Sequence, residues 1–163
     1  MWTLDQRLDW LGGIIDGEGT FTATLRKGGH QGWLTPRFIV ANTNEALMLE
    51  VQSILDAIGV PSYLRYYVPP NKPRVKPSWW IEVKGKDRLE RLLVELESRL
   101  VAKGPQAELL IRLIRRRREI AVGRSMHYTK VPIDQDSEIV ECVGRIHELN
   151  RRGVVPDESI TGS

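Results

Sequence analysis

Apolar residues change their spacing several times along the chain, and each change predicts a new element. The first run repeats at helical intervals, at Leu4, Leu8, Leu11 and Ile15. Thr3 with Gln6 forms a capping-box pattern at its start, and Gly17 and Gly19 end it. A second amphipathic run, over 47–58, closes at Gly59.

Two segments carry the alternation and the turn residues of β-hairpins. The first, "TFTATLRKGGHQGWLTPRFIVANT", holds two β-favouring runs around "KGGHQG". The second joins "PSYLRYYV" to "SWWIEVKG" through the proline-rich, basic "PPNKPRVKP". Each hairpin follows a predicted helix, so the two hairpins are expected to form one antiparallel sheet.

Three helices are predicted after the second hairpin. One opens at Asp87 with Glu90 three residues on and buries leucines as far as Leu100, a second runs over 105–122, and a third over 136–152. The fold class is therefore α+β, an αββαββα core with a four-stranded sheet, helices on one face and further C-terminal helices. We expect a single domain over 1–163, with its core at 4–125, a loop and helix at 126–153, and a flexible tail at 154–163.

Charge is distributed unevenly although the net charge is only +3. Residues 20–43 and 61–86 together hold nine bases and one acid, whereas the chain from Val131 onward holds seven acids and three arginines. Such segregation indicates a surface for a polyanion, most often nucleic acid. The chain has no apolar run long enough for a membrane span, no signal-peptide pattern and a single cysteine, so we expect a cytoplasmic or organellar-matrix protein without a membrane partner.

Strand alternation predicts which side chains the open sheet face presents to a DNA groove. They are Thr22, Thr24, Arg26, Trp33, Thr35, Arg37, Ile39, Arg65, Tyr67, Ser78, Trp80, Glu82 and Lys84. Arg74 and Lys76 in the hairpin loop and Arg124 and Lys130 after the arginine run 115–118 are further candidates for phosphate contacts. Some members of the arginine run are expected to pair with surface acids. The alternative to a DNA-binding face is an ordinary solvated sheet face.

The stretch "LGGIIDGEG", residues 11–19, ends a helix in two acids and two glycines. It resembles the signature motif of the LAGLIDADG homing endonucleases, and the element order that follows resembles the family's core, with its saddle-shaped sheet. The resemblance implies a site-specific DNA endonuclease that hydrolyses both strands at a long, nearly palindromic target and leaves short 3′ overhangs.

The resemblance also implies roles for individual residues. Glu18 would be the metal-binding carboxylate, the Gly17 carbonyl a second ligand, and Asp16 an organiser of the helix end and a further candidate ligand. "LVAKGPQAELL" and "VANTN" resemble the places of a catalytic lysine and a water-positioning polar residue, here Lys103 and Asn42. Carboxylate and carbonyl oxygens suit Mg²⁺; we expect Mn²⁺ to substitute and Ca²⁺ to bind without supporting cleavage.

The chain contains one such motif, whereas cutting a duplex requires two hydrolytic centres, so the resemblance implies a homodimer. The expected seam comprises Leu8, Leu11, Gly12, Gly13 and Ile15, because paired glycines let two helices approach closely. Two alternatives stay open: an intron RNA maturase or non-cleaving DNA-binding protein on the same fold, and an unrelated α/β domain whose basic surface binds an acidic protein. A small-molecule substrate is not expected.

Overall fold

Four antiparallel strands form the single sheet of the computed structural model, which describes residues 1–123 and 128–151. The strands are β1 (Gly19–Arg26), β2 (Trp33–Asn42), β3 (Leu64–Tyr67) and β4 (Ser78–Lys84). They lie in the order β1-β2-β4-β3, so the two hairpins join through β2 and β4. The predicted α+β class and the single antiparallel sheet are confirmed.

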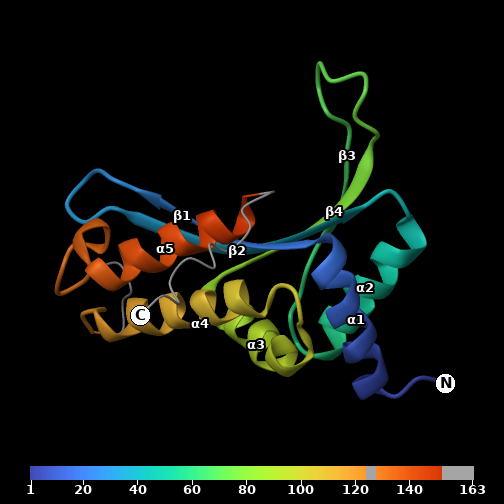
Figure 1. Cartoon of the computed structure of the whole chain (residues 1–163), viewed down its shortest axis with the longest axis horizontal. Coiled ribbons are helices and arrows are strands. Elements are labelled where there is room, and N and C mark those ends of the chain that lie inside the picture. The colour runs from blue at the N-terminus through green and yellow to red at the C-terminus, as the bar shows by residue number, and fades with distance from the viewer. Residues whose placement is uncertain (124–127, 152–163) are drawn as a thin grey trace, which may run out of the picture.

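Five α-helices of the described residues follow the predicted order around the hairpins: α1 (Leu4–Glu18), α2 (Glu45–Ala57), α3 (Lys86–Leu96), α4 (Gly104–Glu119) and α5 (Ser137–Asn150). Short 3₁₀ turns lie at Glu97–Arg99 and Ile133–Gln135. Figure 1 shows α1 to α4 beneath the sheet and α5 beside β1. Within the described ranges, no helix covers the opposite face of the sheet.

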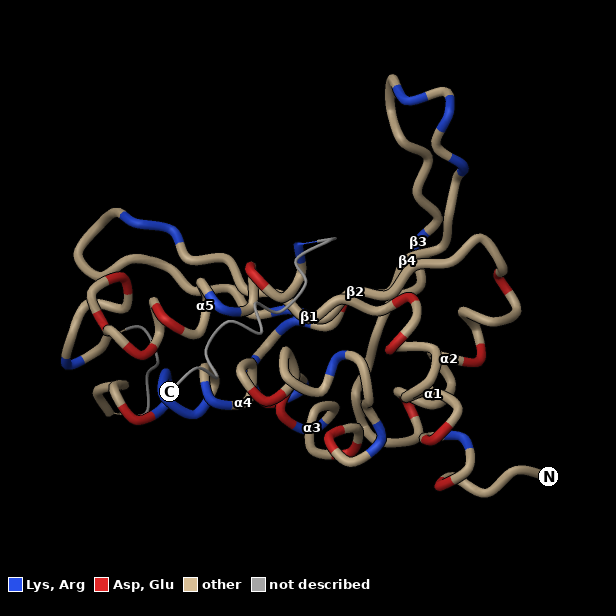
Figure 2. Tube along the Cα trace, viewed as in Figure 1, with Lys and Arg blue, Asp and Glu red and all other residues tan. Residues whose placement is uncertain are grey.

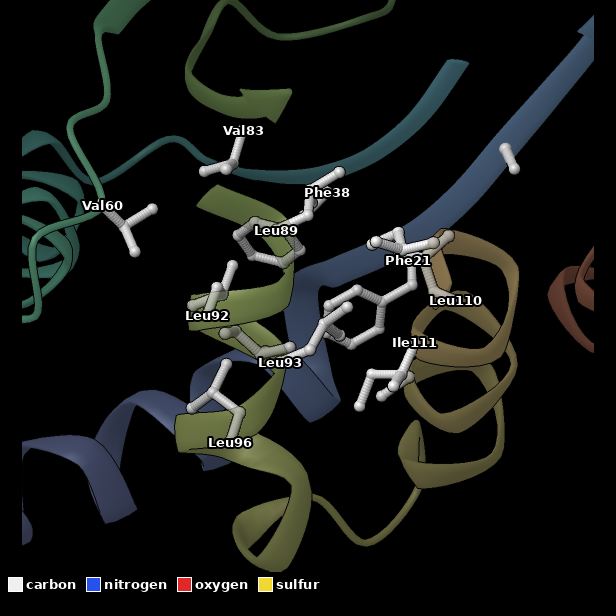
Figure 3. Close-up of a cluster of buried hydrophobic side chains, with 14 of the residues drawn as sticks. Phe21, Phe38, Val60, Val83, Leu89, Leu92, Leu93, Leu96, Leu110 and Ile111 are labelled. Carbon is white, nitrogen blue, oxygen red and sulfur yellow. The ribbon is translucent and has the colours of Figure 1, made fainter. Parts of the chain in front are cut away.

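The core lies between the sheet and these helices. Phe21 of β1 and Phe38 of β2 are fully buried, and their ring centroids lie 5.2 Å apart. Figure 3 shows the apolar side of α3, including Leu89 and Leu93, directed towards these rings. Burial of alternate strand residues and of one helix stripe therefore leaves the polar strand residues on the open face.

The N-terminal caps of α1 and α3 differ. Thr3 Oγ1 accepts a hydrogen bond from the Gln6 amide, and the Gln6 side chain accepts one from the Thr3 amide, which confirms the predicted capping box. In contrast, α3 follows Gly85 (φ 89°) without a side-chain cap. The helix begins at Lys86, one residue before the predicted start at Asp87. Asp87 and Glu90 form ion pairs with Arg118 of α4.

The helix α5 covers the edge strand of the sheet. His147 Nε2 lies 2.7 Å from the Ala23 carbonyl oxygen, and Asn150 Nδ2 donates to the Phe21 carbonyl. These bonds satisfy carbonyls of β1 that have no strand partner, which protects the edge from pairing with another chain. The β1–β2 turn is also anchored, because the Gln31 carbonyl accepts from the Ile133 amide at 2.7 Å.

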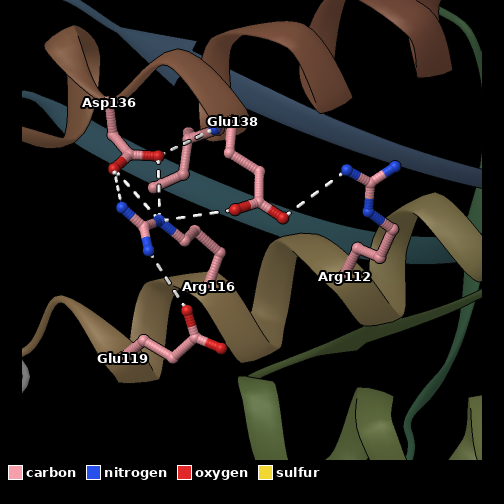
Figure 4. A network of polar contacts seen from close by, with 6 residues as sticks. Arg112, Arg116, Glu119, Asp136 and Glu138 are labelled. Carbon is pink, nitrogen blue, oxygen red and sulfur yellow. Dashed lines mark hydrogen bonds and ion pairs between the residues drawn. The ribbon is translucent and has the colours of Figure 1, made fainter.

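Acids neutralise much of the arginine run on α4. Arg116 donates to Asp136 and Glu119, and Arg112 pairs with Glu138 (Figure 4). Arg115 pairs with Glu90, as Arg118 does. The predicted pairing of this run with acids is confirmed for three of its four members, and these contacts fix α3 and α5 against α4. No helix in the described part of the chain is both long and apolar enough to cross a membrane.

Candidate active site and nucleic-acid interface

The junction between α1 and β1 places Glu18 at the rim of the sheet. The backbone turns from helix to strand at Gly19, where an added Cβ would lie 2.8 Å from the Ile15 carbonyl oxygen, so only glycine fits. Glu18 is exposed and makes no hydrogen bond or ion pair with a described residue. Its carboxylate is therefore available to a ligand.

The second acid of the motif is engaged within the chain. Asp16 Oδ2 accepts a hydrogen bond from the Val101 amide (2.7 Å), and its Oδ1 accepts one from the Lys103 amide (2.9 Å). Burial raises the pKa of Asp16. This effect is outweighed by hydrogen bonds from the amides of Val101, Lys103 and Ala102 and by the charge of Lys103, so the pKa lies below its ordinary value. Asp16 thus fixes the segment between the Glu97–Arg99 turn and α4.

This segment brings Lys103 to the end of α1. Lys103 Nζ donates to the carbonyl oxygens of Ile15 (3.0 Å) and Asp16, which lie in the last turn of the helix. A cation there interacts favourably with the helix dipole. Burial lowers the pKa of Lys103, and the charges of Asp16 and Glu18 oppose this shift. The structure therefore brings together Asp16, Glu18 and Lys103.

Two further predicted site residues are Gly17 and Asn42. Gly17 is exposed in the last turn of α1, and Asn42 ends β2, two positions beyond the partner of Gly19. Asn42 Oδ1 accepts the Asn44 amide at 2.8 Å in the turn before α2. The structure records no bond from Asn42 to Glu18 or Lys103.

The donor set suits a hard cation but is incomplete within the described residues. Glu18 supplies a free carboxylate, and the end of α1 supplies backbone carbonyls, which are the oxygen ligands that Mg²⁺ prefers. Among the residues described, no group of three or more His, Cys, Asp or Glu side chains could hold a metal. The described residues thus fit a divalent ion that takes further ligands from elsewhere.

The open sheet face carries the predicted polar row at one end. Thr22, Arg37 and Lys84 are register partners across β1, β2 and β4. Glu82 lies 3.6 Å from Arg37 and 3.1 Å from Lys84 and so holds both bases. Beside them is a hollow of about 420 Å³ lined by Thr24, Arg26, Trp33, Thr35, Arg37 and Lys84. Ile39 is half-buried in the same face.

Aromatic residues dominate the other end of this face. Arg65 is the register partner of Trp80, and the rings of Tyr67 and Trp80 lie 5.4 Å apart. Trp80 Nε1 donates to Ser78 Oγ at 2.6 Å, which fixes the indole. The rings of Tyr66 and Trp79 are also in contact, with centroids 5.0 Å apart. Strand alternation puts this pair on the face that the helices cover, yet Tyr66 is exposed because β3 is an edge strand.

The β3–β4 loop projects from the body of the molecule as an arm, defined here as residues 68–77 (Figure 1). Figure 2 shows basic positions along it, and these are Lys72, Arg74 and Lys76. Our sequence prediction included Arg74 and Lys76 but omitted Lys72, although a base between prolines in the same loop carries the same signal. Lys130 is exposed, whereas Arg124 lies outside the described residues.

The predicted dimer seam requires a correction. Leu8, Leu11 and Ile15 are 4%, 0% and 0% exposed, and Gly12 is buried against Arg99, so the chain's own core covers these four residues. Gly13 alone of the five is exposed. The outward stripe of α1 runs through exposed Gln6, Gly13 and Gly17 and half-buried Trp10, about half a turn from the four buried residues of the predicted seam.

Comparisons with known proteins agree with this architecture. The family model described as LAGLIDADG-like domain matches residues 5–120, whereas a comparison with curated proteins gives no match. The archaeal intron-encoded homing endonuclease I-Vdi141I, solved with DNA, is similar at TM-score 0.67 and 16% identity over 93% of this chain and 88% of that one. I-CvuI, solved with a DNA target in the presence of Mg, gives 0.55 and 16% over 88% and 96%.

Other similar structures are longer than this chain. The intron-encoded homing endonuclease I-CeuI, also solved with DNA, gives a TM-score of 0.61 and 16% identity over 90% of this chain and 66% of that one. At these identities the structures show a shared fold, and the family model covers most of the chain. The chain belongs to the LAGLIDADG-like domain family.

Proposed function

We propose that this protein is a site-specific DNA endonuclease that hydrolyses phosphodiester bonds with a divalent metal ion. The observation that carries the proposal is the position of Glu18 and Lys103 together at the rim of an open, basic and aromatic sheet face. The similar structures of I-CvuI, I-Vdi141I and I-CeuI were solved with DNA. Strand side chains on such a face suit the major groove.

Each residue of the site has a distinct task. Glu18, with the Gly17 carbonyl, would hold Mg²⁺, which when bound polarises the phosphate and activates water. The Lys103 ammonium stabilises the negative charge that develops on the phosphate oxygens, and Asn42 orients the attacking water. Arg37, Lys84 and Arg65 contact bases, and the arm contacts phosphates.

A homodimer would supply the two centres that a double-strand break requires. This chain matches nearly the whole of the I-CvuI chain but only 43% of the I-GzeII chain and 49% of the I-CpaMI chain, so one copy corresponds to about half of those longer nucleases. The stripe of Gln6, Trp10, Gly13 and Gly17 lets two α1 helices approach closely. Such a dimer would read a nearly palindromic target and leave short 3′ overhangs.

The test is a randomised duplex library incubated with the purified protein, with Mg²⁺, Mn²⁺, Ca²⁺ or no metal, followed by sequencing of the cut ends. We expect cleavage with Mg²⁺ and Mn²⁺ and binding alone with Ca²⁺. Glu18→Gln should abolish cleavage and retain DNA binding, while Glu45→Gln, at the start of α2, should leave both unchanged. Binding without cleavage under every condition would identify a non-cleaving binder on the same fold.

A further inference from the structure

We infer that Asp16 is a positioning residue that sets Lys103 beside Glu18, and that it is not a metal ligand. The inference rests on the proposed function for its catalytic consequence and on the geometry of one chain for its structural part. Both carboxylate oxygens of Asp16 accept backbone amides, those of Val101 and Lys103. An ion at this carboxylate would have to compete with these short bonds.

The bonds of Asp16 and Lys103 form a closed pair between distant segments. Asp16 receives the Lys103 amide through its side chain, and its backbone carbonyl accepts from Lys103 Nζ. Nζ also donates to the Ile15 carbonyl at 3.0 Å. Lys103 is thus held at both its backbone and its side-chain end, which fixes a long side chain that would otherwise sample many rotamers.

In the described part of the chain the 101–103 backbone has one other hydrogen bond, from the Ala107 amide to the Lys103 carbonyl, and this bond ties it to α4 and not to α1. Lys103 is the N-cap of α4, a position where its side chain makes no capping bond, and Val101 and Ala102 are exposed. Removing the carboxylate of Asp16 therefore frees the 101–103 turn, and the ammonium leaves the end of α1. The site would keep Glu18 but lose the fixed charge beside it.

Cleavage kinetics test the catalytic part of this inference. Asp16→Ala should lower kcat about 10- to 100-fold, the range for residues that orient a functional group, with DNA affinity unchanged. In a Lys103→Ala background the same substitution should have almost no further effect, because both changes remove one contribution. A full, additive loss in that background would overturn the inference, since an independent metal ligand would produce it.

A measurement without DNA or metal tests the structural part. Acetylation of Lys103 by an amine-reactive ester, followed by mass spectrometry, should be slow in the wild type relative to exposed Lys72 and several-fold faster in Asp16→Ala. Asp16→Asn keeps one acceptor oxygen and should give an intermediate rate. Asp5→Ala, which removes another contact between α1 and the Glu97–Arg99 turn, serves as the matched control and should leave the rate unchanged.

The two measurements separate the two claims. If the wild type fails to cleave DNA, the proposed function fails while the labelling result still judges the role of Asp16. Equal labelling rates of Lys103 in the wild type and both Asp16 variants would overturn the positioning role, whatever the cleavage result.

Discussion

Adjacent glycines on α1 should respond in opposite ways to alanine. An added Cβ at Gly12 would lie 3.0 Å from the Arg99 carbonyl oxygen and 3.1 Å from Arg99 Cβ, whereas at Gly13 it would meet nothing within 4 Å. Alanine in a helix interior is favoured over glycine by about 0.8–1 kcal/mol. Gly13→Ala should therefore raise the free energy of unfolding of the isolated subunit by about 1 kcal/mol, or about 2–4 °C in Tm.

At Gly12 the same propensity gain is opposed by overpacking, which costs about 1–3 kcal/mol. Arg99 cannot move aside easily, because Asp5 and Asp9 both hold its guanidinium. Gly12→Ala should therefore be neutral to destabilising by about 2 kcal/mol. Chemical unfolding, followed by circular dichroism at the lowest usable protein concentration, measures both variants.

Gly13→Ala should also weaken the proposed dimer. If Gly13 lies at the seam, its methyl group should raise the dimer Kd about 5- to 150-fold, which corresponds to the same overpacking range of about 1–3 kcal/mol. Sedimentation at several concentrations measures this change. Gly144→Ala, at an equally open and exposed position of α5, is the matched control and should stabilise without affecting the dimer. A Gly13→Ala protein that dimerises like the wild type would refute the seam.

Three further outcomes are expected. Lys103→Met should slow cleavage strongly while changing DNA affinity little, and equal losses in both assays would contradict a role at the reacting phosphate. Replacing the three bases of the arm (Lys72, Arg74 and Lys76) by alanine should flatten the slope of log binding constant against log salt by up to about 2.7 for each bound subunit, as measured by fluorescence anisotropy. An unchanged slope would exclude phosphate contacts there. Hydrogen bonds from Arg116 lower the pKa of Asp136 below its ordinary 3.8. The ionised carboxylate therefore stabilises the fold when the pH is above the pKa of Asp136 in the unfolded chain, and this stabilisation is lost as the pH falls through the pKa of the folded protein. In acid titrations of unfolding, the difference in stability between wild type and Asp136→Asn should therefore shrink below about pH 4.

Periodicity predicted the elements well but could not assign the helix faces of α1. Leu8, Leu11 and Ile15 repeat at the spacing of any buried stripe, and a subunit core and a dimer seam produce the same pattern. In the structure, these three large apolar side chains pack in the core of the subunit. The outward stripe contains Gly13 and Gly17, whose lack of side chains carries little hydrophobic signal.

Long-range contacts explain the remaining differences. The sequence predicted that a helix opens at Asp87, yet the helix begins one residue earlier and the Asp87 carboxylate pairs with Arg118 on the next helix. Asp16 likewise has its partners at Val101 and Lys103. Neither pairing has a local signature, because it depends on how helices dock after they have formed. Identifying Glu18 and Lys103 as candidates required the family resemblance, whereas their proximity required the structure.

The paired acids at the end of α1 contribute to the molecule in different ways. A helix C-terminus disfavours negative charge, and the fold offsets this by directing two amides at Asp16 and the Lys103 ammonium at the last carbonyls. The carboxylate of Asp16 is therefore occupied by hydrogen bonds within the chain, whereas Glu18 has no hydrogen bond or ion pair with a described residue. The same arrangement predicts different outcomes for the two acids: Glu18→Ala should leave the fold intact and remove cleavage, whereas Asp16→Ala should free the 101–103 turn.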